Sequence, residues 1–178
     1  MTDAAKHKLY ILTIALSLLT SALFVFCKFH YIYALYFLAI TLLTTLSHCL
    51  FRVWFANLII QLFIKKLDHN SWWFREHWFE KNLYKFLMVK KWKSKLPTWY
   101  DEHFHVRTVE RDRLISYICE AEVYHEICVV LSFIPLLYSI PFGKFEIFLW
   151  TSIGAAIFDL LFVIIQRYNR PRVERLRK

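Results

Sequence analysis

The apolar positions of the chain fall into long runs that are separated by short or strongly polar segments. Two runs near the N-terminus carry no Lys, Arg, Asp or Glu, and two more follow in the second half of the chain. An α-helix needs ~20 predominantly apolar residues to cross the hydrocarbon core of a bilayer, and each run is close to that length. The predicted transmembrane helices are residues 9–27, 31–50, 114–138 and 145–165.

The pattern leaves the ends of two predicted spans open. Neither Pro nor Gly separates residues 50 and 64, so the second span either extends to residue 64 as one long tilted helix or is followed by a shorter helix. We favour an exit from the membrane near residues 65–66, where two lysines follow the run. Pro135 is expected to bend or end the third span, because Pro removes a helical hydrogen bond.

Residues 66–113 have a different pattern, in which Trp, Tyr and Phe alternate with Lys, Arg and His. Trp and Tyr concentrate at the boundary between lipid and water, and long basic side chains extend to the same depth. We therefore expect amphipathic helices that lie on the membrane face. Residues 166–178 read as a basic cytoplasmic tail. The predicted architecture is a single all-α membrane domain over residues 1–178, with about four transmembrane helices and interfacial amphipathic helices.

Composition and charge agree with this reading. The hydrophobic fraction is 58%, whereas soluble domains are nearer ~45–50% apolar. The formal net charge of +9 is concentrated in residues 65–117, with twelve basic and seven acidic residues, and in residues 166–178, with six and one. Basic segments beside spans are typical of the cytoplasmic side and attract anionic headgroups. We expect a multi-pass protein of the cell membrane with both termini cytoplasmic, which contacts membrane lipids and not nucleic acid.

The strongest candidate for chemistry is the segment 120–126, which contains four ionisable residues and leads directly into an apolar run. Glu122, His125 and Glu126 have the spacing i, i+3 and i+4, which places them on one helical face. Ionisable groups at membrane depth are costly and tend to face a polar cavity. The segment is either a reactive centre or the interfacial end of a helix whose carboxylates pair with basic residues. Asp159, inside the fourth span, is a second candidate for the same reason.

Three short motifs resemble those of the glycosyl-4,4'-diaponeurosporenoate acyltransferases, membrane enzymes that complete staphyloxanthin-type carotenoids. The most specific is Gln-Arg-Tyr-Asn-Arg-Pro-Arg-Val at residues 166–173, directly after a span. A Phe-Glu…Trp-Lys block occupies residues 79–97, and Ala-Glu-x-x-His begins at residue 121. The resemblance covers residues 56–176, so the first span is an addition to the family pattern.

The resemblance implies transfer of a fatty acyl group from a thioester donor, either acyl-coenzyme A or an acyl-carrier thioester, to a sugar hydroxyl of a glycosylated carotenoid or similar glycolipid. His125 would be the base, and Glu122 its orienting partner or the base itself. We expect no metal and no cofactor beyond the thioester co-substrate, and apolar spans that hold the lipid acceptor. The expected substrate-binding residues are Arg167, Asn169, Arg170, Arg172, Lys91, Trp92, Lys93, Gln166 and Asp159.

Other readings of the same residues remain. A non-enzymatic scaffold or subunit of a lipid-synthesis complex would tolerate changes at Glu122 and His125. A di-iron oxidoreductase needs two Glu-x-x-His motifs and further carboxylates, and the predicted spans contain one such motif. The four cysteines form no C-x-x-C pair and read as buried thiols, although Cys119 lies near the acidic cluster.

Overall fold

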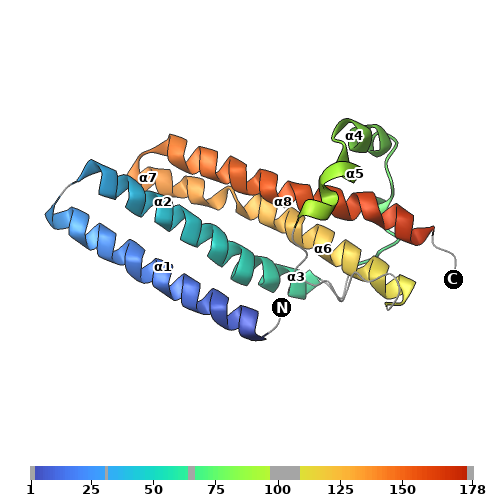
Figure 1. Ribbon diagram of the computed structural model, residues 1–178, viewed down its shortest axis with the longest axis horizontal. Helices are drawn as coiled ribbons and strands as arrows, with labels where there is room; N and C mark the ends of the chain where they lie inside the picture. Colours follow the sequence, from blue (N-terminus) through green and yellow to red (C-terminus); the bar gives the residue numbers. More distant parts are fainter. Residues whose placement is uncertain (1–2, 31, 64–66, 97–108, 176–178) are drawn as a thin grey trace. The chain divides into compact units, whose positions relative to one another are not determined.

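Figure 1 shows the computed structural model, which describes residues 3–30, 32–63, 67–96 and 109–175, with side chains from Tyr10 onward. These residues form helices and turns and contain no strand, so the predicted all-α fold class is confirmed. Residues 97–108 of the predicted interfacial segment and residues 176–178 of the predicted tail are not among the residues that the structure describes. The α-helices are α1 (Asp3–Phe29), α2 (Tyr33–Leu50), α3 (Asn57–Phe63), α4 (Glu80–Phe86), α5 (Val89–Trp92), α6 (Arg111–Leu131), α7 (Ser139–Phe142) and α8 (Phe145–Glu174).

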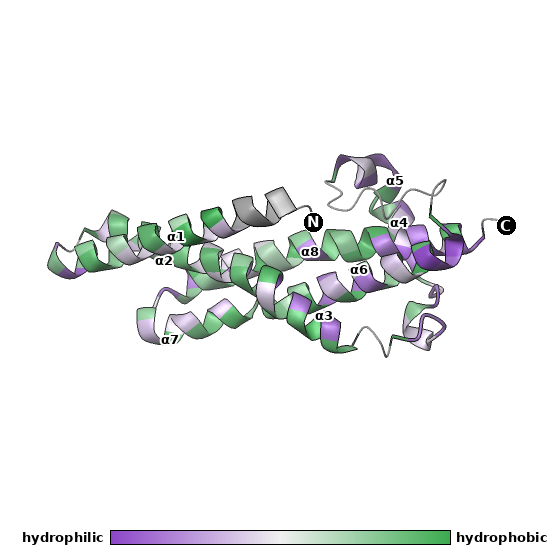
Figure 2. Cartoon of the chain, turned by 90° about the horizontal axis from the view of Figure 1, so that it is seen from below, coloured by the Kyte–Doolittle hydropathy of each residue, from purple (hydrophilic) through white to green (hydrophobic). Residues whose placement is uncertain are grey.

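Four helical stretches among the described residues are long and apolar enough to cross a membrane. In Figure 2, hydrophobic residues dominate α1 and α2, and hydrophilic residues become frequent towards the end of α8. Each of the four overlaps one predicted span and extends beyond it at one end or both, although the first two begin one and two residues later than predicted. The stretches are Tyr10–Phe29, Tyr33–Phe63, Arg111–Phe142 and Phe145–Glu174.

The second stretch extends well beyond residue 50. A π-helical turn, Phe51–Ala56, follows α2 directly and leads into α3. Such a turn accommodates an irregularity without ending the helix. Arg52 lies in this turn and donates a hydrogen bond of 3.1 Å from Nη2 to the carbonyl oxygen of Ala155. The helical conformation therefore reaches Phe63, and residues 64–66 lie outside the description.

The third stretch is interrupted near Pro135, as the sequence suggested. After α6 ends, a 3₁₀ segment, Ile134–Tyr138, begins with this proline near its first position and is followed by the short helix α7. Pro is tolerated at the start of a helical segment, where its missing N–H has no intrahelical partner to lose. Gly143 then adopts a φ of +65°, which a residue without a Cβ adopts readily, and the chain turns into α8.

The fourth helix continues through most of the segment that the charge pattern predicts as a basic tail. α8 extends to Glu174, and Tyr168 and Val173 in this part are buried. Burial of apolar side chains contributes about 25 cal/mol per Å² of apolar surface removed from water. Packing of these two side chains therefore explains why a strongly basic segment remains helical.

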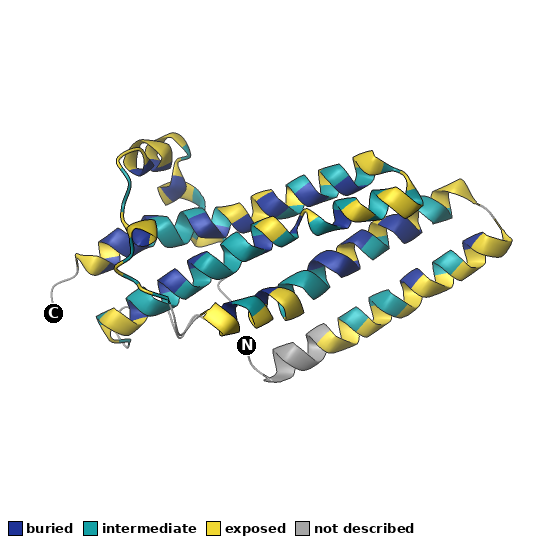
Figure 3. Cartoon of the chain, turned by 180° about the vertical axis from the view of Figure 1, so that it is seen from behind, coloured by how far each residue is buried: buried dark blue, intermediate teal, exposed yellow. Residues whose placement is uncertain are grey.

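The chain divides into two compact units, each built from two separate stretches. The first comprises Met1–Asn57 and Cys128–Ile157. Within it α1 packs along α2, and the Phe24 ring lies 5.5 Å from that of Phe142. Figure 3 shows many exposed positions along α1, and large apolar side chains occupy most of them. Such a surface suits a helix that faces lipid, where apolar side chains have no need of burial against protein.

The second unit comprises Leu58–Ile127 and Phe158–Lys178. One small core brings together Tyr84, Val89 and Tyr168, so that the helices α4 and α5 pack on the end of α8. A second core joins α6 to α8 through Leu114, Ile118 and Val173. These contacts fix the positions of the polar side chains that α6 and α8 direct toward each other.

Candidate active site

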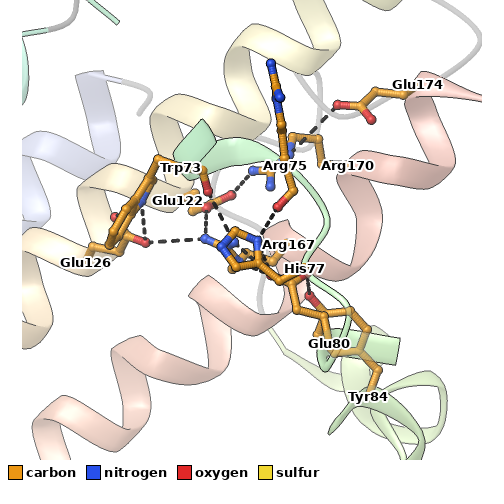
Figure 4. A network of polar contacts seen from close by, with 10 residues as sticks. All are labelled: Trp73, Arg75, His77, Glu80, Tyr84, Glu122, Glu126, Arg167, Arg170 and Glu174. Carbon is orange, nitrogen blue, oxygen red and sulfur yellow. Dashed lines mark hydrogen bonds and ion pairs between the residues drawn. The ribbon is translucent and has the colours of Figure 1, made fainter. Parts of the chain in front are cut away.

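Glu122 lies on α6, and its side chain is completely buried. Arg167 donates a hydrogen bond of 2.8 Å from Nη1 to Glu122 Oε1, and Arg170 donates one from Nη1 to Glu122 Oε2. The two arginines are three residues apart on α8 and so project from one face of that helix. Figure 4 shows both guanidinium groups meeting the carboxylate. Each carboxylate oxygen has its own arginine partner, which offsets the cost of burying the charge.

Arg167 also joins α8 to α4. Its Nε and Nη2 donate hydrogen bonds of 3.0 and 2.8 Å to Glu80 Oε1, and Nη2 lies 3.2 Å from the carbonyl oxygen of Trp73. Glu80 is the first residue of α4 and is 2% exposed. The planar guanidinium group therefore contacts two carboxylates and one peptide carbonyl at once, which its fork of donors allows.

Tyr84 completes this part of the network. Its hydroxyl donates a hydrogen bond of 2.7 Å to Glu80 Oε2, and its ring packs edge-on against that of Tyr168 at 5.4 Å. Burial, followed by the hydrogen bond to Glu80, raises the pKa of Tyr84 above its ordinary value. The phenol therefore stays protonated at neutral pH and remains a donor to Glu80.

Arg170 is the most deeply buried cation among the described residues, with 0% exposure. Its Cζ lies 5.2 Å from the centre of the Phe74 ring, and Glu174 Oε1 lies 3.9 Å from its Nε. Nε and Nη2 have no hydrogen-bond partner among the described residues. The side chain is thus held by Glu122 on one side and by an aromatic face on another.

Glu126 lies one helical turn beyond Glu122 and is only partly buried. The indole Nε1 of Trp73 lies 3.2 and 3.1 Å from its two carboxylate oxygens. Arg167 Nη1 is 4.0 Å from Glu126 Oε1. The carboxylates of Glu122 and Glu126 on this face of α6 therefore pair with arginine or indole donors.

His125 has a partner on α8. Its Nδ1 lies 3.1 Å from Asp159 Oδ1, and the Asp159 side chain is 2% exposed. The imidazole stacks on the Phe162 ring, with centroids 4.6 Å apart and planes 12° apart. A carboxylate accepts hydrogen bonds, so this contact suits the tautomer of His125 that has its proton on Nδ1 and leaves Nε2 as an acceptor. Among the described residues, none hydrogen-bonds to Nε2.

The two residues predicted as catalytic therefore have separate partners. Glu122 contacts Arg167 and Arg170, whereas His125 contacts Asp159. Among the contacts between described residues, none joins Glu122 to His125. The sequence leaves Glu122 as either the orienting partner of His125 or the base and assigns Asp159 to substrate binding, whereas in the structure the carboxylate that contacts His125 is that of Asp159.

A second group of predicted residues meets beyond the buried network. Lys93 Nζ donates a hydrogen bond of 3.0 Å to Asn169 Oδ1 and lies 4.9 Å from the centre of the Tyr168 ring. Arg172 Cζ lies 3.4 Å from the centre of the same ring, and its Nη1 donates to the carbonyl oxygen of Tyr168. The structure thus brings Lys93, Asn169 and Arg172 together around one aromatic side chain.

The remaining predicted substrate-binding residues have less specific surroundings. Trp92 donates a hydrogen bond of 2.8 Å from Nε1 to the carbonyl oxygen of Leu87, so its indole closes the turn between α4 and α5. Lys91 is exposed and Gln166 is partly buried. Neither side chain forms a hydrogen bond or ion pair with another described residue.

Sequence reasoning missed three contributors to the network. The sequence predicts Trp73 only as an interfacial aromatic, and Glu80 and Tyr84 only as members of the Phe-Glu…Trp-Lys block. An acidic residue within a segment otherwise rich in Lys, Arg and Trp was the one available signal for Glu80. Its arginine partner lies 87 positions away, and spacing along the chain carries no information on such a pair.

Comparison with known proteins identifies the family. The family model described as glycosyl-4,4'-diaponeurosporenoate acyltransferase matches residues 70–178, which include the whole buried network and the His125–Asp159 pair. No curated protein and no solved structure matches the chain. The first two membrane-spanning stretches lie outside the matched residues. Because the match covers more than half of the sequence, the chain belongs to the glycosyl-4,4'-diaponeurosporenoate acyltransferase family.

Proposed function

We propose that the protein is a membrane O-acyltransferase that moves a fatty acyl group from a thioester donor to a sugar hydroxyl of a glycosylated carotenoid or similar glycolipid. Family membership supports the reaction class and the kind of acceptor. The observation that carries the proposal is the His125–Asp159 pair, a histidine whose Nδ1 faces a buried carboxylate. Such a pairing prepares the opposite ring nitrogen to accept a proton.

In the proposed reaction, His125 Nε2 accepts the proton of the sugar hydroxyl as its oxygen attacks the thioester carbonyl carbon. The tetrahedral intermediate then collapses, the carbon–sulfur bond breaks, and the thiolate leaves. His125 returns the proton to the departing sulfur, so the products are an ester and a free thiol. Asp159 acts through His125: it fixes the imidazole tautomer and stabilises the imidazolium that forms between the two steps.

Glu122 is better suited to a positioning role than to that of a base. Both carboxylate oxygens of Glu122 already accept hydrogen bonds from guanidinium groups, so neither oxygen faces a substrate hydroxyl. We propose that Glu122 holds Arg167 and Arg170 in place and thereby fixes α8 against α6. Since Asp159 and the two arginines lie on the same helix, the position of His125 relative to Asp159 depends on this anchor.

The acceptor and the donor of the proposed reaction place different physical requirements on the protein. The acceptor is a lipid-linked sugar, and the exposed apolar side chains along the spans suit its hydrocarbon part. The donor thioester is carried either by coenzyme A or by a carrier protein, and the reaction needs no further cofactor. We propose a location in the cell membrane with the basic segments on the cytoplasmic side, where thioester donors are made.

The test compares acyl transfer by His125→Gln and Asp159→Asn with that of the wild type, using protein purified in lipid nanodiscs. His125→Gln is expected to lower the turnover rate by about 10²–10⁴-fold, the usual contribution of a general base. Asp159→Asn should lower it by at least about tenfold and alter its pH profile, because the tautomer of His125 is no longer fixed. His30→Gln is the matched control, since His30 is exposed and lies outside the family match.

Normal turnover in both variants would exclude the proposed centre. If the wild type itself transferred no acyl group to any glycolipid while a lipid-synthesis complex failed to form without it, the scaffold reading would replace this one.

A further inference from the structure

A cluster of positive charges surrounds Tyr168 near the end of α8. Arg172 lies over the Tyr168 ring, with Cζ 3.4 Å from the centroid, and Lys93 Nζ is 4.9 Å from the same centroid. Lys90 stands three residues before Lys93 and is close enough to act on its charge. We refer to Lys90, Lys93 and Arg172 as the Tyr168 cluster. The ring and Asn169, which accepts from Lys93, hold the two inner cations at defined positions.

The cluster has no counter-charge within the described part of the chain. No carboxylate there lies within ion-pair distance of Lys90, Lys93 or Arg172. Neighbouring cations of the same unit differ in this respect. Lys81 Nζ lies 3.7 Å from Glu76 Oε2, and Arg175 Nη2 lies 2.9 Å from the same oxygen.

Lys93 is affected both by its burial and by the neighbouring positive charges. Partial burial, followed by the charges of Arg172 and Lys90, lowers the pKa of Lys93 below its ordinary value. Three cations held together without an anion repel one another, and a bound anion would relieve this repulsion. A lysine that acts as a point charge and an arginine with unused planar donors are the groups that proteins use to bind phosphate.

We propose that the Tyr168 cluster binds a phosphate group. Two sources present this chemistry at the site: the phosphates of a thioester donor, which coenzyme A and the carrier-protein prosthetic group both contain, and the headgroup of an anionic lipid. The assignment of the phosphate to a thioester donor rests on the proposed acyl transfer. The proposal that the cluster binds phosphate does not depend on that reaction. Arg167 and Arg170, which the sequence grouped with Arg172, are excluded from this site because Glu80 and Glu122 already neutralise them.

The experiment measures binding rather than turnover, so its result does not depend on the proposed reaction. The full chain is reconstituted in nanodiscs of phosphatidylcholine and titrated with coenzyme A, or with pantetheine, which lacks phosphate. In a second arm, retention of phosphatidylglycerol by the purified protein is measured by mass spectrometry. The variants are Lys93→Gln and Arg172→Gln, and the matched controls are Lys81→Gln and Arg175→Gln, each of which removes a cation that is paired with Glu76.

Loss of one charge-assisted phosphate contact is expected to weaken coenzyme A binding by about tenfold in each cluster variant. The controls should stay within about twofold of the wild type, and pantetheine should bind equally weakly to every variant. His125→Gln should bind coenzyme A normally even if it is inactive, which separates failure of this site from failure of the proposed reaction. A selective loss of phosphatidylglycerol in the cluster variants would support the phosphate site and assign it to lipid headgroups. If cluster and control variants were indistinguishable in both arms, the proposal would be wrong.

Discussion

At the scale of single residues, the buried carboxylates Glu122 and Asp159 illustrate two uses of a charge inside a membrane protein. Glu122 is surrounded by two arginines, each of which donates to one of its oxygens. Asp159 faces the imidazole of His125, with Oδ1 3.1 Å from Nδ1. The first arrangement is already neutralised and suits packing. The second places the Asp159 carboxylate beside an imidazole, a group that accepts and releases protons near neutral pH, and it suits proton transfer.

Replacement of Glu122 by alanine should therefore destabilise the protein more than it alters chemistry. Removing one partner from a buried ion pair typically costs about 3–5 kcal/mol, because the remaining charges are left uncompensated. We expect a clear fall in the thermal unfolding temperature of Glu122→Ala in nanodiscs. Glu120→Ala is the control on the same helix, since Glu120 is only partly buried and its carboxylate lies 3.4 Å from Ser116 Oγ. Equal unfolding temperatures for the two variants would contradict the anchoring role of Glu122.

The lowered pKa of Lys93 predicts how coenzyme A binding depends on pH. Its folded-state pKa lies below the ordinary lysine value of 10.5, so the ammonium group loses its proton earlier than a solvated lysine as pH rises. Affinity should be full below the lowered pKa and should decline as pH rises through it, before 10.5 is reached. Lys93→Arg keeps its charge over this range and should show no decline. Isothermal titration at increasing pH measures both, and parallel curves for wild type and variant would count against Lys93 as a phosphate ligand.

The sequence predicted part of this site for identifiable reasons. Spacing along α6 placed Glu122, His125 and Glu126 on one face, because helical periodicity is local information. It did not distinguish which of Glu122 and Asp159 would face His125. That choice depends on the relative rotation of α6 and α8, which packing between distant residues such as Ile118 and Val173 sets. The same limit explains why Glu80 was not paired with Arg167 in advance.

At the scale of elements, the length of an apolar run predicts the membrane-spanning helices well, whereas the charge of a segment predicts their ends poorly. The four spans and the interruption at Pro135 follow from run length and from the missing N–H of proline. The end of α8 does not follow from these features, because the basic charge of residues 166–178 predicts a tail instead of a helix. Its helical conformation depends on Tyr168 and Val173, which are buried against residues of α4, α5 and α6. Tertiary contacts, which a local pattern does not reveal, decide where this helix ends.

The segment between α3 and α6 is predicted to contact the lipid surface through its aromatic side chains. Trp78 is 88% exposed, Phe86 is 81% exposed and Trp72 is 66% exposed, in a stretch that also carries Lys85 and Lys90. Exposed indoles beside basic residues are typical of the membrane interface. Trp78→Phe should therefore remove part of the tryptophan fluorescence that shallow spin-labelled lipids quench.

Trp92→Phe is the control for this measurement, because the Trp92 indole is partly buried and hydrogen-bonded to the carbonyl oxygen of Leu87. Its loss should leave the lipid-quenched fraction nearly unchanged. If both substitutions removed the same fraction, or if Trp78→Phe removed none, the exposed aromatics would face water instead of lipid.

At the scale of the whole molecule, the proposed chemistry lies in one of the two compact units. Glu80, Glu122, His125, Asp159 and Arg167 all belong to the second unit and to the residues that the family model matches. The first unit includes α1 and α2, which precede the match. The residues of the proposed chemistry therefore lie in the second unit, whereas α1 and α2 of the first unit lie outside the matched residues and carry exposed apolar side chains that suit a lipid environment.

The membrane orientation can be tested with the full chain. An even number of spans puts both termini on one side, and the two most basic segments, residues 65–117 and 166–178, then share that side as well. The connections around residues 28–30 and 143–144 carry few charges and should lie outside. In intact cells, Lys144→Cys should react with a membrane-impermeant maleimide, whereas Lys90→Cys should react only after the membrane is opened. Labelling of Lys90→Cys from outside would place the Tyr168 cluster away from the cytoplasmic thioester donors, and the donor assignment of its phosphate would have to be abandoned.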